Sequence, residues 1–280
     1  MGVLYIDKPK GITSFDVCFR LRKVLHTKKI GHTGTLDPNA TGVMVVLFDK
    51  DTKANQFLVS AYKEYEAEVI LGIQTDTLDI DGEIIETGEV RMPDRAELLR
   101  ALNKYLGNSK QLPPLTSAIK IDGKKLYEYQ REGVEVEIPL RDIEIKEIEL
   151  LKVNENTFSF RCVVSSGTYI RSLVRDVLND LGVIGTLKEL RRTRVDAISI
   201  DDCESLDVVV AGNYKVHNLL DILSKQYQTV VLKNDLRVRQ GKVLKLDNCT
   251  ERVLIAANNQ AIAIYEKRDD GLYHCLRGLW

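Results

Sequence analysis

The chain has 280 residues, a length that suits one or two domains with a sizeable core. Its 40 basic and 41 acidic residues give a net charge of -1, and 44% of the residues are hydrophobic. This composition is typical of an ordinary soluble protein and excludes a histone-like polycation or a disordered acidic chain. No run approaches about 18 apolar residues, so a transmembrane helix is not expected.

The amino-terminal apolar run is broken by Asp7 and Lys8, which argues against a secretory signal. The five cysteines are scattered and contain no Cys-x-x-Cys pair. This usage is typical of reduced thiols and of neither a disulfide framework nor a zinc site. We therefore expect a cytoplasmic protein with no membrane association.

The near-zero net charge averages unlike regions. Seven basic and one acidic residue fall within 8–29, six and two within 104–131, and seven and three within 161–194. Residues 63–97 hold eleven acidic and three basic residues. The basic segments are either solvated faces or parts of one surface that follows a phosphate backbone, and charge alone leaves both open.

The first half of the chain alternates strands and helices. A strand is expected at 2–7, and a helix capped by Ser14 is expected to run to about His26. The expected elements that follow are a buried strand at 43–48, a helical segment at 52–61, a strand at 63–71, an acidic turn at 75–82 and a helix at 94–106.

The second half begins with a loop bracketed by Pro113 and Gly123. The expected elements are then a helix at 126–131, an extended segment at 134–138, antiparallel strands near 143–148 and 158–164, a helix at 168–181, and a short helix ending at 190–192. From about Thr229 the chain is expected to form short strands at 229–232, 253–256 and 261–265. These predict a small separate β domain.

A polar loop at 31–42 holds three glycines, three threonines, His32 and Asp37 between a basic helix and a buried strand. Gly-rich loops are costly for stability alone and often carry function. The loop lacks the spacing of a P-loop, and His32 and Asp37 have no further metal ligands near them in sequence. Asp37-Pro38 also fits a simple turn, and His32 fits a hydrogen-bonded loop residue. An aspartate, Arg171 and the aromatic Tyr65 and Tyr169 nevertheless suggest a carboxylate site for a flat substrate.

Five ordered motifs carry a resemblance to a known family. They are Lys8-Pro9-Lys10-Gly11-Ile12-Thr13-Ser14, then Gly31 to Pro38 with Ala40-Thr41-Gly42, then Lys63-Glu64-Tyr65 with Thr75 to Asp79, then Gln111 to Pro114 with Ser117 to Lys120, and Gly167 to Arg171. Over roughly residues 1–195 the chain resembles the TruB family, the stand-alone bacterial tRNA pseudouridine-55 synthases. The carboxyl-terminal part is only loosely similar to the family's PUA-like module.

The resemblance implies an α+β pseudouridine synthase catalytic fold with a mixed, largely antiparallel central sheet. It implies a catalytic domain at 1–227, with an RNA-gripping insertion at about 105–138, and a short PUA-like β domain at 228–280. It also implies that Asp37, Tyr65 and Arg171 are catalytic, and that His32, Tyr65, Tyr169 and Leu190 line the site of the flipped nucleotide. The basic segments add Lys8, Lys120, Lys124 and Lys125 as contacts to the RNA backbone.

The implied activity is isomerisation of uridine-55 in the T arm of tRNA to pseudouridine. It needs no cofactor, metal, guide RNA or obligatory protein partner, and a monomer is expected. Two alternatives stay open: a guide-RNA-dependent rRNA pseudouridine synthase, and an RNA-binding or tRNA-folding protein without catalysis.

Overall fold

The protein is described here as a computed structural model that covers residues 1–58, 61–117, 119–134 and 136–280. Val59, Ser60, Ala118 and Glu135, which fall within or beside expected elements, lie outside the described residues. The chain divides into two units. The described residues of the first unit are 1–37, 43–58 and 201–280, and those of the second are 38–42 and the described part of 61–200.

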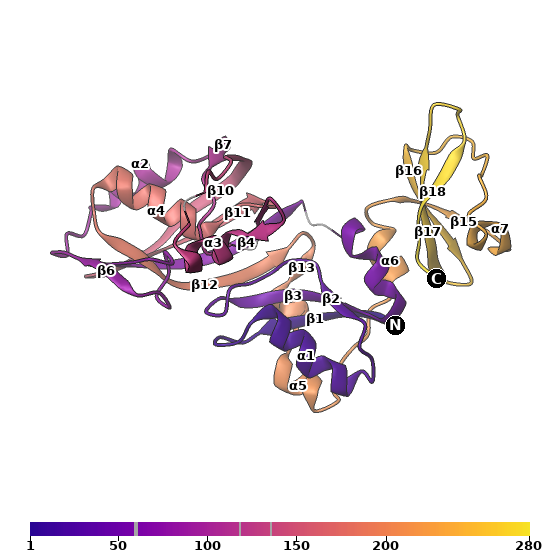
Figure 1. Cartoon of the computed structure of the whole chain (residues 1–280), viewed down its shortest axis with the longest axis horizontal. Coiled ribbons are helices and arrows are strands. Elements are labelled where there is room, and N and C mark those ends of the chain that lie inside the picture. The colour runs from indigo at the N-terminus through magenta and orange to yellow at the C-terminus, as the bar shows by residue number, and fades with distance from the viewer. Residues whose placement is uncertain (59–60, 118, 135) are drawn as a thin grey trace. The chain divides into compact units, whose positions relative to one another are not determined.

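The first unit places helices on a small sheet (Figure 1). Strand β1 (Gly2–Lys8) pairs in parallel with β14 (Glu204–Ser205), and β2 (Ile30–His32) pairs antiparallel with β3 (Thr41–Phe48). Helices α1 (Ser14–Val24) and α5 (Leu206–Val210) share one buried apolar cluster with β1 and β3, and the 3-10 helix η1 (Asp49–Phe57) follows β3. The apolar residues of β1 and the apolar run of β3 therefore build a core, as the sequence predicts.

The amino-terminal cap of α1 corrects one expectation. Thr13, and not Ser14, is the N-cap: its hydroxyl accepts from the Asp16 N–H at 3.0 Å, and the Asp16 carboxylate accepts from the Thr13 N–H at 2.9 Å. This reciprocal pair is a capping box. The helix ends at Val24, two residues before the expected His26, which has a positive φ of 50°. Ser14 is thus available for a different contact, described below.

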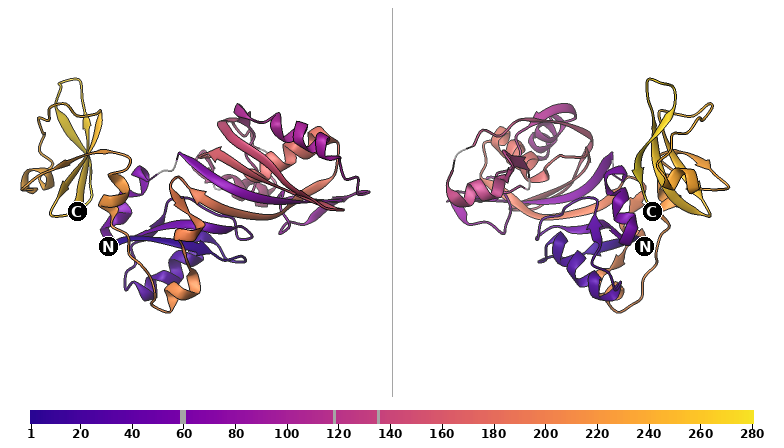
Figure 2. Two further views of the ribbon diagram at one scale, coloured as in Figure 1. Left: turned by 180° about the vertical axis from the view of Figure 1, so that it is seen from behind. Right: turned by 45° about the vertical axis from the view of Figure 1, so that its right-hand side comes forward.

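The first unit also contains the predicted carboxyl-terminal β structure (Figure 2). Strands β15 (Gln228–Val231), β16 (Arg252–Ala257), β17 (Gln260–Lys267) and β18 (Tyr273–Gly278) form one sheet in that order. Helix α6 (Leu219–Leu223) precedes β15 in sequence, and helix α7 (Leu236–Arg239) lies between β15 and β16. The expected small carboxyl-terminal sheet is confirmed, whereas a domain boundary between 227 and 228 stays a prediction.

The second unit is built on a larger antiparallel sheet. Its order is β12 (Gly185–Val195), β4 (Tyr62–Leu71), β11 (Thr157–Ser165), β10 (Arg141–Val153) and β7 (Gly107–Gln111). Helices α2 (Arg95–Asn103) and α4 (Ile170–Leu181) pack against each other and against β10 and β12. Residues 41 and 42 pair in parallel with β12, so the pairing is mixed and largely antiparallel, which confirms the expected fold class.

Smaller elements complete this unit. They are the hairpin of β5 (Ile73–Thr75) and β6 (Ile84–Thr87), the pair β8 (Lys120–Ile121) and β9 (Lys124–Lys125), helix α3 (Leu126–Glu132) and strand β13 (Ile198–Ser199). The 3-10 helix η2 (Ile200–Asp202) follows β13, and its last two residues are assigned to the first unit. Only the backbone is described for Lys125, Tyr127, Gln130 and Arg131. No helix in the described part of the chain is long and apolar enough to cross a membrane.

The prediction of a short helix that ends at 190–192 is wrong. Residues 185–195 instead form β12, which pairs with β4 along most of its length. The local sequence is rich in Leu, Lys, Glu and Arg, which are good helix formers. Pairing with two neighbouring strands overrides this local preference, because strand formation depends on the sheet around it.

Candidate active site

The loop that carries Asp37 is fixed by a side chain from α1. The Ser14 hydroxyl accepts a hydrogen bond from the Leu36 N–H at 2.8 Å and donates to the Leu36 carbonyl at 3.0 Å. Both Ser14 and Leu36 are buried. The backbone immediately before Asp37 is therefore held at both of its polar groups, and the ring of Pro38 restricts the backbone after it. The Asp37 side chain is half-buried.

The end of the same loop requires a glycine. Gly42 has a φ of 104°, and a Cβ there would collide with the backbone of Arg192. Gly42 and Arg192 are partners where β3 begins alongside β12. Any larger residue would push the two strands apart, so this motif glycine serves a close backbone approach.

Tyr65 lies on one face of the sheet in the second unit. It is buried on β4 opposite Arg192 of β12 on one side and Cys162 of β11 on the other. Leu190 lies opposite Ala67 on the same pair of strands. Residues that face each other across antiparallel strands share a face, and positions two apart along a strand do so as well. Tyr65 and Leu190 are thus diagonal neighbours on one face.

Two basic residues, Lys63 and Arg192, neighbour Tyr65 on the sheet. Lys63 precedes Tyr65 by two residues, and its Nζ donates to the Ser166 hydroxyl at 3.3 Å. Burial, with a further contribution from the charge of Arg192, lowers the pKa of Lys63 to about 8. Two basic side chains thus neighbour Tyr65 on its sheet face, and the Asp196 carboxylate acts on Lys63 in the opposite sense to Arg192.

Arg171 is a buried arginine at the start of α4, only 4% exposed. Its Nη1 donates to the Thr77 carbonyl at 2.9 Å and to the Thr116 hydroxyl, and its Nη2 donates to the Thr116 carbonyl at 3.1 Å. Its Nε lies 3.7 Å from Asp79 Oδ2. These partners come from segments remote in sequence, so the guanidinium joins the acidic turn to the base of the insertion.

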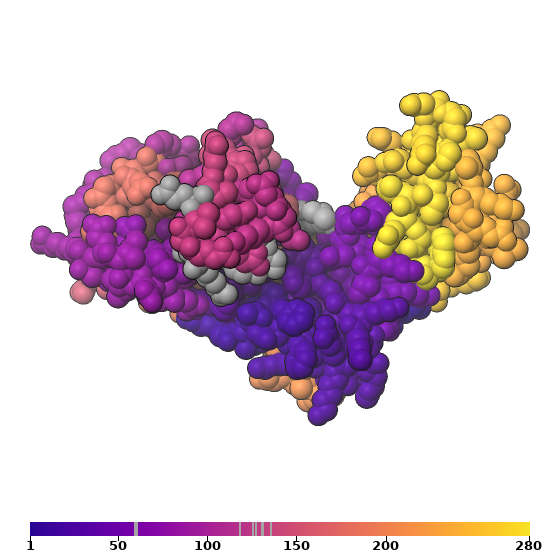
Figure 3. Space-filling model, viewed as in Figure 1, coloured from indigo at the N-terminus to yellow at the C-terminus, as the bar shows by residue number. Residues whose placement is uncertain are grey.

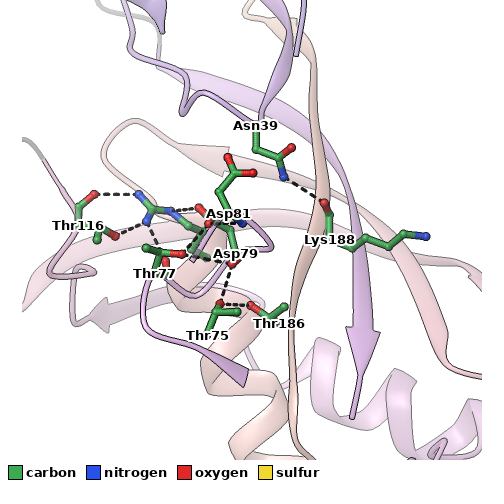
Figure 4. Close-up of polar contacts among 9 residues, drawn as sticks. Asn39, Thr75, Thr77, Asp79, Asp81, Thr116, Thr186 and Lys188 are labelled. Carbon is green, nitrogen blue, oxygen red and sulfur yellow. Dashed lines mark hydrogen bonds and ion pairs between the residues drawn. The ribbon is translucent and has the colours of Figure 1, made fainter. Parts of the chain in front are cut away.

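Asp79 is itself held by the turn that contains it. Its Oδ1 accepts from the Thr77 hydroxyl at 2.7 Å, and its carbonyl accepts from the Thr75 hydroxyl at 2.6 Å. The hydroxyls of Thr75 and Thr186 lie 2.9 Å apart, which connects the turn to β12 (Figure 4). The expected acidic turn is thus a hydrogen-bonded structure in which Thr75 and Asp79 are buried, and its Thr77 carbonyl and Asp79 carboxylate contact Arg171.

Tyr169 is the N-cap of α4 and is held by Gln111. The Tyr169 N–H donates to Gln111 Oε1 at 2.8 Å, and Gln111 Nε2 donates to the Tyr169 carbonyl at 3.1 Å. One turn further along, the Ser172 hydroxyl donates to the Leu112 carbonyl at 2.8 Å. The base of the insertion is therefore hydrogen-bonded to the first turn of α4.

The candidate residues are distributed over both units. Asp37 and His32, the latter half-buried at the end of β2, belong to the first unit. Tyr65, Tyr169, Arg171 and Leu190 belong to the second. Within the second unit, Tyr65 and Leu190 share a sheet face, and Tyr169 and Arg171 share the start of α4. The expected pairing of Asp37 with Arg171 stays a prediction.

The expected RNA-backbone lysines have different surroundings. Lys8 is fully buried, and its Nζ donates to the Pro9 carbonyl at 3.0 Å. The burial of its side chain therefore does not support a contact with an RNA phosphate. Lys124 forms an ion pair with Glu132, and its Nζ lies 4.8 Å from the Tyr129 ring centroid. Lys120 is exposed on β8. The side chain of Lys125 lies outside the described part of the chain.

Sequence reasoning did not assign Gln111, Thr116 or Asp79 to the site. Each lies within or beside a motif of the family resemblance, but none has a residue type that marks it as special. Their role follows from contacts to α4, which lies more than fifty positions further along the chain. Among the described residues, no cluster of three or more His, Cys, Asp or Glu side chains could hold a metal ion.

Two solved structures have similar folds. A chain of the Cbf5-Nop10-Gar1 complex aligns with a TM-score of 0.70 and 26% identity, covering 95% of this chain and 78% of that one. A chain of the archaeal box H/ACA sRNP Nop10-Cbf5 complex aligns with a TM-score of 0.72 and 22% identity, covering 100% and 86%. The fold is therefore shared along almost the whole chain.

Residues 22–170 match the family described as "TruB family pseudouridylate synthase (N terminal domain)", which makes this chain a pseudouridylate synthase by class. The proteins named tRNA pseudouridine synthase B of Lactobacillus acidophilus and Bacillus cytotoxicus are 36% and 40% identical over 95% of this chain, covering 94% and 92% of their own lengths. That of Fusobacterium nucleatum is 48% identical over 71% of this chain and 69% of its own length. The chain belongs to the TruB family, which confirms the resemblance.

Proposed function

We propose that this protein isomerises uridine-55 in the T arm of tRNA to pseudouridine. The proposal rests on the family and on relatives that carry the name tRNA pseudouridine synthase B over nearly their whole lengths. It extends to a cytoplasmic monomer that uses no guide RNA and no protein partner, and to a catalytic domain at 1–227 with a PUA-like domain at 228–280.

The reaction is an isomerisation. The bond from ribose C1′ to uracil N1 breaks, the uracil turns, and a bond forms from C1′ to C5. C5 loses its proton and N1 gains one, so atoms balance and no electrons are exchanged. The uridine must first leave its stack, which costs a few kcal/mol that stacking and hydrogen bonds in the site must offset.

The candidate residues divide this work. The Asp37 carboxylate acts as covalent catalyst by trapping the detached sugar or the base. Tyr65 stacks on the uracil and takes the C5 proton, and Arg171 keeps Asp37 ionised. His32, Tyr169 and Leu190 line the flipped nucleotide, and Lys120, Lys124 and Lys125 contact phosphates. Lys8 is fully buried, so we leave it out of the proposed phosphate contacts.

The fixed backbone before Asp37 is the structural observation that carries this proposal. A covalent catalyst must be held within a fraction of an ångström of its productive position. The two hydrogen bonds between Ser14 and Leu36 provide such support within the first unit. A simple surface turn would not need a buried hydroxyl from another element.

The decisive test is Asp37→Asn, assayed by mass spectrometry and site mapping on a T-arm stem-loop. Loss of a covalent catalyst is expected to lower turnover by at least about 10³-fold. RNA binding should be nearly unchanged, because the substitution conserves size. Retained turnover in this variant would refute the catalytic assignment of Asp37.

Tyr65→Phe separates stacking from proton removal. The ring is kept, so RNA affinity should stay close to wild type, whereas loss of a general base is expected to lower turnover by about 10²–10⁴-fold. Single-turnover rates on the same stem-loop give the answer. A wild-type rate would mean that the hydroxyl has no essential part.

The guide-RNA-dependent alternative is favoured by one observation, the fold shared with Cbf5 chains that lie in complexes with Nop10 and Gar1. Those chains are 22–26% identical to this one, below the 36–48% of the tRNA synthase relatives. Incubation of the pure protein with an unmodified tRNA transcript distinguishes the two. Pseudouridine at position 55 without any added RNA or protein is the expected result.

A further inference from the structure

Helix α1 exposes two aromatic rings on its outward face. Of the six phenylalanines in the chain, four are buried, whereas Phe15 and Phe19 are each 61% exposed. They are four residues apart, so their rings lie one above the other on the helix surface. Exposed aromatic rings forgo the stabilisation of burial, and such a patch commonly marks an interaction surface.

An arginine joins the two rings into one patch. The Arg22 guanidinium carbon lies 5.4 Å from the Phe15 ring centroid and 5.9 Å from that of Phe19, within the range of cation–π attraction. Lys23 is exposed beside them on the next turn. We call Phe15, Phe19, Arg22 and Lys23 the α1 outer face.

Helix α1 carries three basic side chains, Arg20, Arg22 and Lys23, and one acidic side chain, Asp16. Arg20, Arg22 and Lys23 form no ion pair with any acid in the described part of the chain, and Asp16 is the only acidic residue of α1. Asp16 itself is committed to the capping box with Thr13. The outer face therefore offers cations and ring faces together, which is the combination that binds phosphates and stacks on bases.

The α1 outer face is connected to the Asp37 loop. Ser14, the first residue of α1, holds Leu36, and Phe15 and Phe19 follow it within about 8 Å along the helix axis. Helix α1 belongs to the indigo segment on the visible surface in Figure 3. An RNA strand that approaches Asp37 therefore passes close to these rings.

We infer that the α1 outer face is a second RNA-binding surface, on which Phe15 and Phe19 stack on bases of the substrate RNA other than the modified uridine. Arg22 and Lys23 contact the adjoining phosphates. The inference rests on the proposed function, because it takes an RNA as the substrate. The exposed pair Ile84 and Ile85, 59% and 61% exposed, lies among Glu83, Glu86 and Glu89 and would repel the same ligand.

The test compares two double variants, Phe15→Ala with Phe19→Ala and Ile84→Ala with Ile85→Ala. Filter binding gives the Kd for an unmodified tRNA transcript and for a T-arm stem-loop. The phenylalanine variant is expected to bind at least one of the two RNAs about 10-fold more weakly. Its rate of product formation from saturated complex should stay within about twofold of wild type. The isoleucine variant removes a similar exposed apolar area and should bind both RNAs like wild type.

Rescue separates stacking from a change in the helix. Phe15→Tyr with Phe19→Tyr keeps the rings and should restore affinity. Unchanged affinity of the alanine variant for both RNAs, or equal weakening in the isoleucine variant, would overturn the inference and leave the face to another partner, such as a protein. A wild-type protein that binds tRNA but forms no pseudouridine would refute the proposed function alone, because the binding comparison would still decide the role of α1.

Discussion

Residues 8–29 and residues 161–194 each carry seven basic side chains, yet the structure uses them differently. In 161–194, Arg161 and Arg194 both pair with Glu64, at 2.9 Å each, and Lys188 pairs with Glu68 at 3.1 Å. In 8–29, Arg20, Arg22 and Lys23 have no acidic partner among the described residues. A count of charges in sequence therefore overstates the unpaired cations of 161–194, and in 8–29 it also includes the buried Lys8.

The largest effect is expected from Arg171→Lys in segment 161–194. Lysine cannot satisfy the Thr77 and Thr116 carbonyls together, and leaving buried acceptors unpaired costs about 2–4 kcal/mol of unfolding free energy. Urea unfolding measures the loss. Arg175→Lys, one turn along α4 and more exposed, is the matched control and should lose less. Equal losses would mean that burial of Arg171 has no special role.

The second effect concerns the salt dependence of RNA binding. Arg20→Gln with Lys23→Gln removes two unpaired cations, so the slope of log Kd against log salt should fall by about 1–2. Filter binding of tRNA between low and physiological salt gives the slope. An unchanged slope would place these cations away from the RNA and remove the contrast between the two segments.

The complementary variant is Arg161→Gln with Arg194→Gln. Both arginines are partly exposed and pair with Glu64, so we expect a stability loss below about 1 kcal/mol for each ion pair. The RNA salt slope and the turnover should stay at wild-type values. A reduced slope here would show that ion-paired arginines also reach the phosphates.

The smallest effect is a pH dependence at Lys63. Its pKa is about 8 in the folded protein, below the ordinary value of 10.5, so between these pH values the unfolded chain binds more protons than the folded one. The contribution of Lys63 to stability therefore becomes more favourable as pH rises from 8 towards 10.5. The free energy of unfolding of the Lys63→Met variant should exceed that of wild type by the largest amount below pH 8. This difference should shrink towards pH 10. A constant difference in chemical unfolding would contradict the lowered pKa.

Local sequence patterns predicted much of the fold and the candidate site. Alternation located β1, β4 and β11, and the apolar run at 43–48 located β3. Motif composition located Asp37, Tyr65 and Arg171. One error arose where two local preferences competed, at Thr13 and Ser14, which are both good caps. Another arose at 185–195, where strand pairing overrides a helix-favouring local sequence.

By itself the sequence determined the positions of many strands and helices, the glycine-rich loop and the resemblance to the TruB family, because these depend on residue type and short spacing. Only the tertiary structure decided which cations are neutralised and which polar groups hold Arg171. Its partners Thr77 and Thr116 lie 94 and 55 positions away, and Arg161 lies 97 positions from Glu64. Hydrogen bonds and ion pairs act over a few ångströms, so the distances that fix them are set by packing and not by sequence spacing.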